Sequence, residues 1–282
     1  MCTNKKVVCQ ARIVENSAIA PDTFSLVLEA PELVKLVKPG QFIELNLRQP
    51  DLVLPRPISV YSVTPSLMSR PGRSETALRH LEVRYQIMGE GTRRLASMPA
   101  GTELGIFGPL GNTWPIPEGA QRALLIGGGI GSAPLAMLAT QLAEQNVAVT
   151  MVQGGRNAEL LIACDHFEDV CDHHVIATDD GSRGHKGFVT APLKLLLDDD
   201  SLHYDLAYVC GPEPMQEACF ALTAEAGIAT YVSLERMMAC GVGACLTCVV
   251  PTADGLKRVC ADGPIFNAED VNWSEARSAR VH

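Results

Sequence analysis

Four cysteines are crowded into a short segment near the end of the sequence. They are Cys240, Cys245, Cys248 and Cys260, with spacing C-x4-C-x2-C and a fourth cysteine twelve residues later. The chain has ten cysteines, and the other six are scattered. The first residues contain two lysines but no uninterrupted apolar run, so they lack the pattern of a secretory signal. We therefore expect a cytoplasmic protein whose thiols stay reduced, so the ten cysteines need an explanation other than disulfides.

This spacing matches the plant-type ferredoxin arrangement for a 2Fe–2S centre, in which four thiolates hold two irons. A tight loop can present three of them while a nearby hairpin supplies the fourth. Gly241 and Gly243 can adopt positive φ and turn backbone N–H groups towards the sulfurs, which raises the reduction potential. One alternative is a structural zinc site, although such sites more often use two closely spaced cysteine pairs. The other alternative is four unrelated buried thiols.

A second group of residues has the chemistry to bind a flavin nucleotide. Arg56-Pro57-Ile58-Ser59 lies on a predicted strand. An arginine fork can neutralise a pyrophosphate, and a serine hydroxyl can hydrogen-bond near flavin N5. The tetrapeptide resembles the R-x-[YF]-S motif of the ferredoxin reductase superfamily, which binds FAD, with Ile58 in place of the usual aromatic residue. An Arg-Pro pair at a strand edge also occurs without any ligand.

Further motifs of this superfamily follow in order. Gly91-Thr92 resembles a Gly-[ST] pair that begins a helix whose first N–H groups hold the pyrophosphate. Alternatively, Thr92 is only the N-cap of a helix over residues 93–98. By the same resemblance, the strand segment Arg84-Tyr85-Gln86 lies along the isoalloxazine ring, with contacts largely from its backbone.

A glycine-rich turn points to a second nucleotide. Gly127-Gly128-Gly129-Ile130-Gly131 follows a predicted strand and opens a helix, which is the context of a phosphate-binding turn. Ser132 replaces the third glycine of G-x-G-x-x-G, whereas Pro134 completes the reductase form G-G-G-x-G-x-x-P. A purely structural glycine turn is the alternative.

Residues that follow other predicted strands could bind the nicotinamide nucleotide. The segment from Cys210 to Met215 resembles the C-G-P-x-x-M signature of ferredoxin reductases, whose cysteine lies beside the nicotinamide ring. Alternatively, Cys210 is a small buried thiol without chemistry. The carboxylate of Asp179 would suit a ribose hydroxyl and repel a 2′-phosphate, which favours NAD. Arg156 could instead attract a 2′-phosphate, which would favour NADP. Of the two, we expect NAD. Three histidines could in principle be metal ligands, but we expect them to lie on the surface without such a role. They are His173, His174 and His185.

The elements that position these motifs form three units. Short alternating strands predict an N-terminal antiparallel barrel, with residues 64–79 as an exposed loop; they cover residues 7–14, 23–29, 41–47, 58–63 and 81–87. Apolar strands that alternate with helices then predict a Rossmann-like parallel sheet; the strands cover residues 123–126, 148–152, 174–178 and 206–210, and the helices 133–143 and 214–226. The fold class is therefore β plus α/β. We expect a FAD-binding β-barrel domain at 1–117, a NAD-binding α/β domain at 118–232 and a small 2Fe–2S domain at 233–282.

Composition limits the partners. The chain has 282 residues, of which 47% are hydrophobic and 20% charged, as in soluble globular proteins. Its net charge of −9 argues against nucleic acid and anionic membranes as main partners. No apolar stretch reaches the roughly 18–20 residues that span a bilayer.

In their order along the chain, these motifs and the sequence CADGPIF after them resemble the electron-transfer subunits of type B dihydroorotate dehydrogenases. The resemblance implies an oxidoreductase component in which the four crowded cysteines bind the cluster. Electrons would pass from an FMN-containing catalytic subunit, which oxidises dihydroorotate to orotate in pyrimidine biosynthesis, through the cluster and FAD to NAD⁺. It also implies a heterotetramer with two copies of each subunit. The cysteine loop would face the partner, so we expect exposed apolar side chains near residues 241–247.

Other readings share most of these motifs. They include the small subunit of NADH-dependent ferredoxin:NADP oxidoreductases and that of sulfide dehydrogenases. A different class of protein, a zinc-stabilised nucleotide-binding regulator without catalysis, would fit the zinc alternative.

Overall fold

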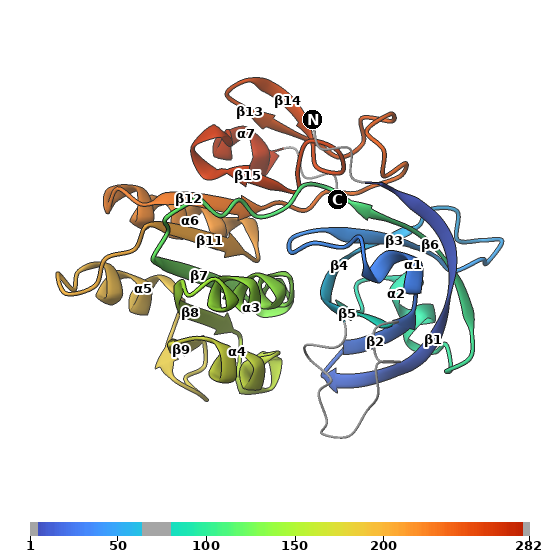
Figure 1. The fold of residues 1–282 in the computed structure, drawn as a ribbon, viewed down its shortest axis with the longest axis horizontal. Helices are drawn as coiled ribbons and strands as arrows, with labels where there is room; N and C mark the ends of the chain where they lie inside the picture. Colours follow the sequence, from blue (N-terminus) through green and yellow to red (C-terminus); the bar gives the residue numbers. More distant parts are fainter. Residues whose placement is uncertain (1–4, 64–79, 279–282) are drawn as a thin grey trace.

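The first part of the chain closes into an antiparallel β-barrel, seen at the right of Figure 1. The computed structural model describes residues 5–63 and 80–278, so the predicted loop at 64–79 lies outside the described residues. The strands are hydrogen-bonded in the order β1-β2-β5-β4-β3-β6. Their bounds are β1 Val7–Ala20, β2 Thr23–Glu29, β3 Phe42–Asn46, β4 Arg56–Val63, β5 His80–Gln86 and β6 Glu103–Leu110.

Side-chain alternation builds the barrel core, because every second residue of a strand points inwards. Leu26, Ile43 and Val83 come from three different strands and are all fully buried. Strand β1 is longer than the predicted strand at residues 7–14. Two register shifts in its pairing with β2 bend it, which lets it continue around the barrel.

Two short helices cap the barrel, α1 (Pro31–Val34) and α2 (Glu90–Ala96). Helix α2 begins after Gly89, so the alternative prediction that Thr92 is the N-cap of a helix over 93–98 is wrong. Thr92 is instead in the first turn. Its hydroxyl accepts the N–H groups of Met88 at 2.9 Å and Gly89 at 3.2 Å, which satisfies donors that a helix start leaves free.

The central part of the chain is a seven-stranded sheet in the order β10-β9-β8-β7-β11-β12-β15. All neighbouring pairs are parallel except β12 and β15. The strand bounds are β7 Arg122–Gly128, β8 Ala148–Gly155, β9 His173–Thr178, β10 His185–Lys186, β11 Leu206–Cys210, β12 Ala229–Ser233 and β15 Ile265–Asn267. The strands β10, β12 and β15 were not predicted.

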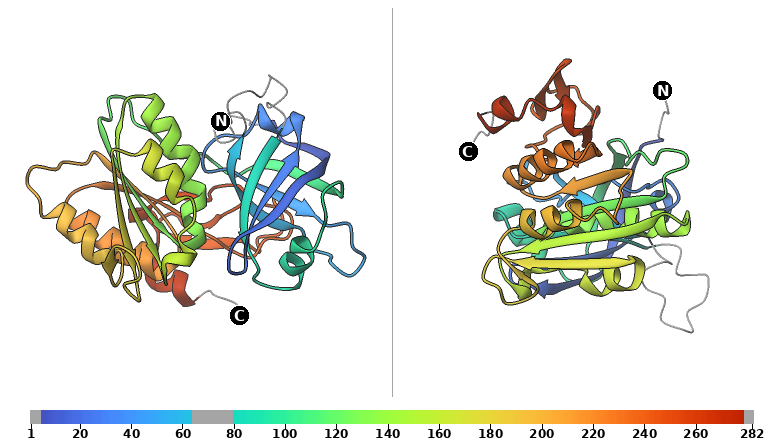
Figure 2. Two further views of the ribbon diagram at one scale, coloured as in Figure 1. Left: turned by 90° about the horizontal axis from the view of Figure 1, so that it is seen from below. Right: turned by 90° about the vertical axis from the view of Figure 1, so that its left-hand side faces the viewer.

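Helices cover both faces of this sheet. Figure 2 shows α3 and α4 on the face towards the barrel and α5 and α6 on the opposite face. Their bounds are α3 Ala136–Glu144, α4 Cys164–Val170, α5 Thr190–Leu197 and α6 Glu213–Glu225. The chain enters α3 through a 3-10 turn at Gly129–Leu135, so the α-helix starts three residues later than predicted. Pro134 lies in that turn and has no N–H to donate.

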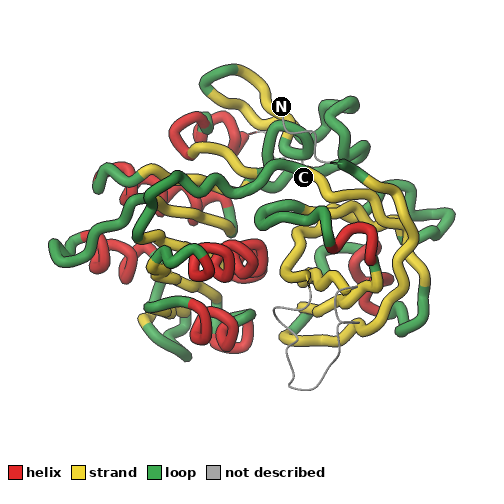
Figure 3. Tube along the Cα trace, in the orientation of Figure 1, coloured by secondary structure: helices red, strands yellow, loops and turns green. Residues whose placement is uncertain are grey.

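The last part of the chain lies over one edge of the sheet and one end of the barrel (Figure 1). It contains the hairpin of β13 (Val249–Thr252) and β14 (Gly255–Arg258) and the helix α7 (Trp273–Ser278). The cysteine segment between β12 and β13 is a loop, coloured green in Figure 3.

Asn112, just after the barrel strand β6, anchors this last unit. Its side-chain nitrogen donates to the carbonyl oxygen of Ile265 at 2.8 Å, and its side-chain oxygen accepts the Ile265 N–H at 3.0 Å. Its own N–H donates to the carbonyl of Gly263 at 2.6 Å. The cysteine unit is therefore held against the barrel by several directed bonds. No described helix has the length and apolar character that crossing a membrane requires.

Candidate functional site for flavin, nicotinamide and an iron–sulfur cluster

A cleft of about 1410 Å³ lies where the three units meet. The barrel contributes the start of β4, the end of β5 and Thr92 of α2. The sheet contributes the turns after β7, β8, β9 and β11, which follows the rule that ligands bind at the carboxyl ends of parallel strands. The segment after β12 and Thr247 of the cysteine loop complete the lining.

The predicted FAD residues converge on the barrel side of this cleft. All but Gly91 line it directly, namely Arg56, Pro57, Ile58, Ser59, Arg84, Tyr85, Gln86 and Thr92. They come from separate parts of the chain, and the pairing of β4 with β5 brings them together. Gly91 lies behind them, against Arg56.

The guanidinium of Arg56 packs on Gly91 so closely that any side chain at position 91 would overlap it. Its Nη1 donates to the carbonyl oxygens of Leu54 and, at 3.4 Å, Pro55. Within the described residues, no acceptor is bonded to Nε or Nη2. A guanidinium has five N–H donors, so donors of Arg56 remain for a pyrophosphate. The site formed by Arg56 and Gly91 therefore fits the pyrophosphate of FAD.

Side chains on β5 are locked by contacts away from the cleft. The guanidinium of Arg84 lies 3.6 Å from the ring centre of Tyr61, and its Nε is 3.1 Å from Glu82 Oε1. The hydroxyl of Tyr85 donates to Asn16 Oδ1 at 3.0 Å, and burial raises its pKa. That β5 offers mainly backbone to the isoalloxazine stays a prediction.

The glycine-rich turn sits at the carboxyl end of β7. Gly128, Gly129 and Gly131 line the cleft, whereas Gly127 lies one position deeper in the strand. A Cβ atom on Gly131 would lie 2.7 Å from the carbonyl oxygen of Cys210. The structure therefore brings together two predicted motifs that are about eighty residues apart.

Cys210 is the last residue of β11 and is almost fully buried. Its thiol does not line the cleft, although Gly211 beside it does. Burial, and to a lesser degree the charge of Glu235, raise the pKa of this thiol far above neutrality. Cys210 is thus a neutral thiol beneath the cleft surface and not a thiolate nucleophile.

Asp179 and Arg156 both line the cleft. Asp179 follows β9, and its N–H donates to the carbonyl of Gly155 at 3.1 Å. The carboxylate that favours NAD and the guanidinium that favours NADP are therefore on neighbouring turns.

Several cleft residues were given no role in the predictions from the sequence. Glu235 lines the cleft near Cys210, and its side chain is exposed. Phe188 and Met88 also line the cleft with largely exposed side chains. A carboxylate, a phenylalanine and a methionine have no periodic signal of their own, so only the fold reveals their position.

The four clustered cysteines form two pairs. The Cys245 N–H donates to Cys240 Sγ at 3.4 Å, and the Cys260 N–H donates to Cys248 Sγ at 3.4 Å. Among the described residues, no three histidine, cysteine or carboxylate side chains are grouped as a single metal ion would require. Two pairs suit a centre with two irons, because each iron then takes two thiolates.

The two pairs differ in their surroundings. Hydrogen bonds from Thr247 and Cys240 lower the pKa of Cys245 to about 6, so this thiol readily becomes the thiolate that binds iron. Burial, and the neighbouring Cys248, raise the pKa of Cys260 to about 12. A bound cation would favour the deprotonated form of Cys260.

The cysteine loop connects the cleft to the outer surface. Thr247, between two of the cysteines, lines the cleft. Val242 and Leu246 point outwards and are 46% and 60% exposed, which confirms the predicted exposed apolar side chains. Below the loop, the carboxyl group of Glu44 on β3 is buried. Its Oε1 has no hydrogen-bond partner among the described residues.

The predicted surface position is wrong for His174. Its side chain is only 5% exposed, its Nε2 lies 3.0 Å from Gln153 Oε1, and its ring packs on Phe167. Burial lowers its pKa. His173 and His185 are exposed, as predicted.

Comparison with known proteins agrees with this geometry. Residues 235–272 match the family model of the iron–sulfur cluster binding domain of dihydroorotate dehydrogenase B, and residues 125–220 match that of the oxidoreductase NAD-binding domain. A solved structure described as an NADH-dependent reduced ferredoxin–NADP oxidoreductase is 30% identical, with a TM-score of 0.83 over 95% of this chain and 91% of that one. A ferredoxin reductase of carbazole 1,9a-dioxygenase, 23% identical over 79% of this chain and 67% of its own, shares the fold with a TM-score of 0.63.

Curated relatives match along almost their whole length. An electron transfer subunit of dihydroorotate dehydrogenase B (NAD(+)) from Shouchella clausii is 38% identical over 267 residues, which is 92% of this chain and 96% of the relative. The corresponding subunit from Clostridium perfringens is 35% identical over 266 residues, or 94% and 98% of the two chains. The predicted fold class and the cofactor set of FAD, 2Fe–2S and NAD(H) are confirmed by these matches. This chain therefore belongs to the family of electron transfer subunits of dihydroorotate dehydrogenase B.

Proposed function

We propose that this chain carries electrons from an FMN-containing catalytic subunit, which oxidises dihydroorotate to orotate, to NAD⁺. When bound, the 2Fe–2S cluster supplies one-electron transfer, and FAD converts single electrons into a hydride for NAD⁺. One observation supports this route above all. The cysteine loop reaches the nucleotide cleft through Thr247 and the outer surface through Val242 and Leu246.

Each group of residues has a part in this proposal. On the barrel, Arg56 directs its free donors at the FAD pyrophosphate, and Ser59 offers a hydroxyl near flavin N5. The remaining residues proposed to bind FAD are Pro57, Ile58, Arg84, Tyr85, Gln86, Gly91 and Thr92. The residues proposed to hold the cluster are Cys240, Cys245, Cys248 and Cys260.

On the sheet, a glycine turn approaches the NAD phosphates and Asp179 the ribose. The turn comprises Gly127, Gly128, Gly129 and Gly131. Cys210 contributes a neutral thiol beneath the nicotinamide position, where its lack of charge keeps the pocket suited to both oxidised and reduced rings.

A subunit named for electron transfer requires a catalytic partner. We propose that the partner covers Val242 and Leu246, that two copies of each subunit form a heterotetramer, and that the complex is cytoplasmic. We also propose domain limits at 1–117, 118–232 and 233–282.

A second candidate has specific support. The ferredoxin–NADP oxidoreductase match extends over 95% of this chain with 30% identity, so a subunit of such an enzyme is the alternative. The two functions differ in the partner and not in the cofactors of this chain.

The experiment that tests the proposal starts with the purified protein under anaerobic conditions. We expect flavin and 2Fe–2S absorption bands that bleach with NADH, with two irons per FAD. A colourless protein with one zinc would contradict the proposal and favour the regulator. Adding the catalytic subunit with dihydroorotate and NAD⁺ should then yield NADH. NADH-dependent reduction of NADP⁺ through ferredoxin, without dihydroorotate oxidation, would instead select the second candidate.

A further inference from the structure

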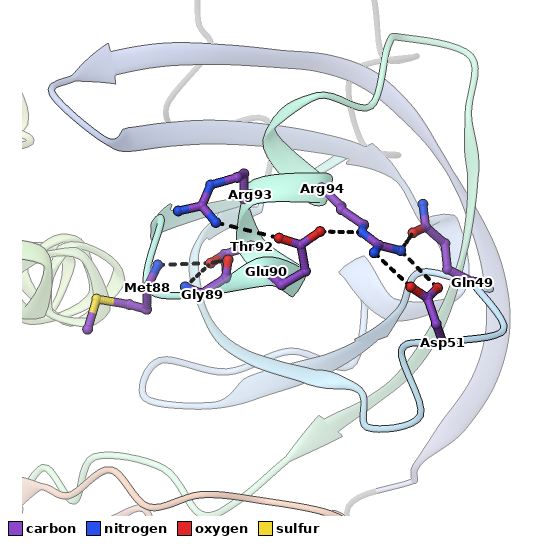
Figure 4. A network of polar contacts seen from close by, with 8 residues as sticks. All are labelled: Gln49, Asp51, Met88, Gly89, Glu90, Thr92, Arg93 and Arg94. Atoms are coloured by element: carbon purple, nitrogen blue, oxygen red, sulfur yellow. Dashed lines mark hydrogen bonds and ion pairs between the residues drawn. The ribbon is translucent and has the colours of Figure 1, made fainter. Parts of the chain in front are cut away.

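A network of charged side chains joins helix α2 to the loop between β3 and β4 (Figure 4). At its centre is the guanidinium of Arg94. Its Nη1 donates to Asp51 Oδ1 at 2.8 Å, and its Nη2 lies 2.7 Å from Asp51 Oδ2. The two groups therefore form a bidentate ion pair. Nη1 also donates to Gln49 Oε1 at 2.7 Å, and Nε to Glu90 Oε1 at 2.7 Å. A guanidinium with all three nitrogens engaged holds its partners in one geometry.

The same loop is attached to the cleft at its other end. Three residues after Asp51, the carbonyl oxygen of Leu54 accepts from Nη1 of Arg56, and so does that of Pro55. Arg56 in turn packs on Gly91, in the first turn of α2. The loop therefore touches α2 twice, through Arg94 at its start and through Arg56 at its end.

Arg94 does not line the cleft, whereas Arg56 does. We propose that Arg94 is a positioning residue for FAD binding. By holding Asp51 and Gln49 against α2, it keeps the carbonyls of Leu54 and Pro55 where they orient Arg56 towards the pyrophosphate. This inference rests on the proposed role of Arg56 in FAD binding.

The neighbouring Arg93 provides a matched control. It lies on the same helix, is 66% exposed, and within the described part of the chain makes one ion pair, 3.5 Å long, to Glu90. The side chain of Arg94 is 31% exposed and contacts three partners. Exposed ion pairs contribute little to stability, so neither substitution should change Tm appreciably, and only that of Arg94 should affect FAD.

The test measures FAD dissociation from the purified holoprotein by flavin fluorescence, with Tm and iron content of each variant alongside. We expect Arg94→Gln to weaken FAD binding roughly tenfold, as is common for coupled sites, and Arg93→Gln to leave it unchanged. Asp51→Asn should weaken binding similarly. The double variant Arg94→Gln with Asp51→Asn should be no worse than either single one, because both break the same contact.

Equal FAD affinity of the Arg94→Gln and Arg93→Gln proteins would overturn the proposal. Additive losses in the double variant would also overturn it, because the two residues would then act separately. Arg56→Gln separates this inference from the function on which it rests. If Arg56→Gln keeps FAD at full affinity, the proposed FAD role of Arg56 fails. If Arg56→Gln loses FAD while Arg94→Gln does not, only the positioning role fails.

Discussion

The carboxyl group of Glu44 lies directly against Gly241 of the cysteine loop. A Cβ atom on Gly241 would be 2.7 Å from both Cδ and Oε2 of Glu44, closer than such atoms can approach. Gly241 also has φ of +60°, a value that favours glycine. Burial, and the nearby Cys245, raise the pKa of Glu44 to about 7. The contact between Glu44 and Gly241 thus determines how closely the cysteine loop packs on β3 of the barrel.

We expect Gly241→Ala to lose most of its iron while the barrel and its FAD remain, because the new methyl group would push the loop off Glu44. Gly255→Ala is the matched control: Gly255 also has positive φ, but nothing lies within 4 Å of the new Cβ position. Iron and sulfide analysis of both proteins decides the matter. Equal iron in both variants would show that the contact with Glu44 does not shape the loop.

The cradle between Arg56 and Gly91 makes a second prediction. In Gly91→Ala, the methyl group must displace the guanidinium, so we expect FAD affinity to fall by about tenfold or more. Gly89→Ala, two residues earlier and with open space around it, should keep FAD. The flavin-to-protein ratio and fluorescence titration measure the effect. Normal FAD content in Gly91→Ala would refute a pyrophosphate site at Arg56.

The buried thiol of Cys210 should affect the rate of hydride transfer and not its pH dependence. We expect Cys210→Ala to slow flavin reduction by NADH on the order of ten- to a hundredfold, because a packed contact beneath the nicotinamide is lost. The wild-type rate should show no thiol ionisation between about pH 6 and 9, since burial raises the pKa of this thiol. Stopped-flow bleaching measures both, with Cys219→Ala, also buried, as the control. An unchanged rate in Cys210→Ala would show that this thiol does not support the nicotinamide during hydride transfer.

Acid should destabilise the protein through His166. Burial lowers its pKa, its ring makes edge contacts with the rings of Tyr61 and Phe167, and its Nε2 lies 3.1 Å from the carbonyl oxygen of Ala136. The folded state thus keeps this histidine neutral when the unfolded chain, with a pKa of about 6.5, already binds a proton. Its stabilising contribution is complete above about pH 6.5 and falls as pH drops towards the lower folded pKa, by at most about 1.4 kcal/mol per pH unit.

His166→Gln should therefore flatten the pH dependence of the unfolding free energy below about pH 6.5, measured by denaturant titration. The amide can still donate to the Ala136 carbonyl. His173→Gln, on the exposed side of β9, is the control. The same slope in all three proteins would mean that His166 is protonated in the folded state as easily as in the unfolded chain.

The exposed residues of the cysteine loop should control assembly. We expect Leu246→Asp to weaken binding of the catalytic subunit by at least about tenfold, because a charge would be buried at the centre of an apolar contact. Cluster and flavin spectra of the isolated subunit should not change. Leu195→Asp, at a residue of α5 that is 66% exposed, should assemble normally. Size-exclusion chromatography of the mixed subunits measures the result, and normal assembly of Leu246→Asp would place the interface elsewhere.

Local signals account for what could be predicted. The spacing of the four cysteines, the glycine turn after β7 and the alternation of the barrel strands each lie within a few consecutive residues. Such patterns depend on backbone geometry and side-chain periodicity, which act over short distances along the chain. The errors in predicting where α2 and α3 begin have local causes too. A threonine such as Thr92 is common both as an N-cap and in the first turn of a helix, and Pro134 is compatible with the 3-10 turn that precedes α3 as well as with the start of an α-helix.

By itself, the sequence determined which residues could bind iron, flavin and nicotinamide, and in which type of element each would lie. Only the tertiary structure decided how they meet. The pairing of Cys248 with Cys260, the contact of Glu44 with Gly241 and the placing of Thr247 in the cleft all join segments that the chain alone does not relate. These contacts arise when separate hydrophobic faces pack into one core, and that packing depends on the whole chain at once.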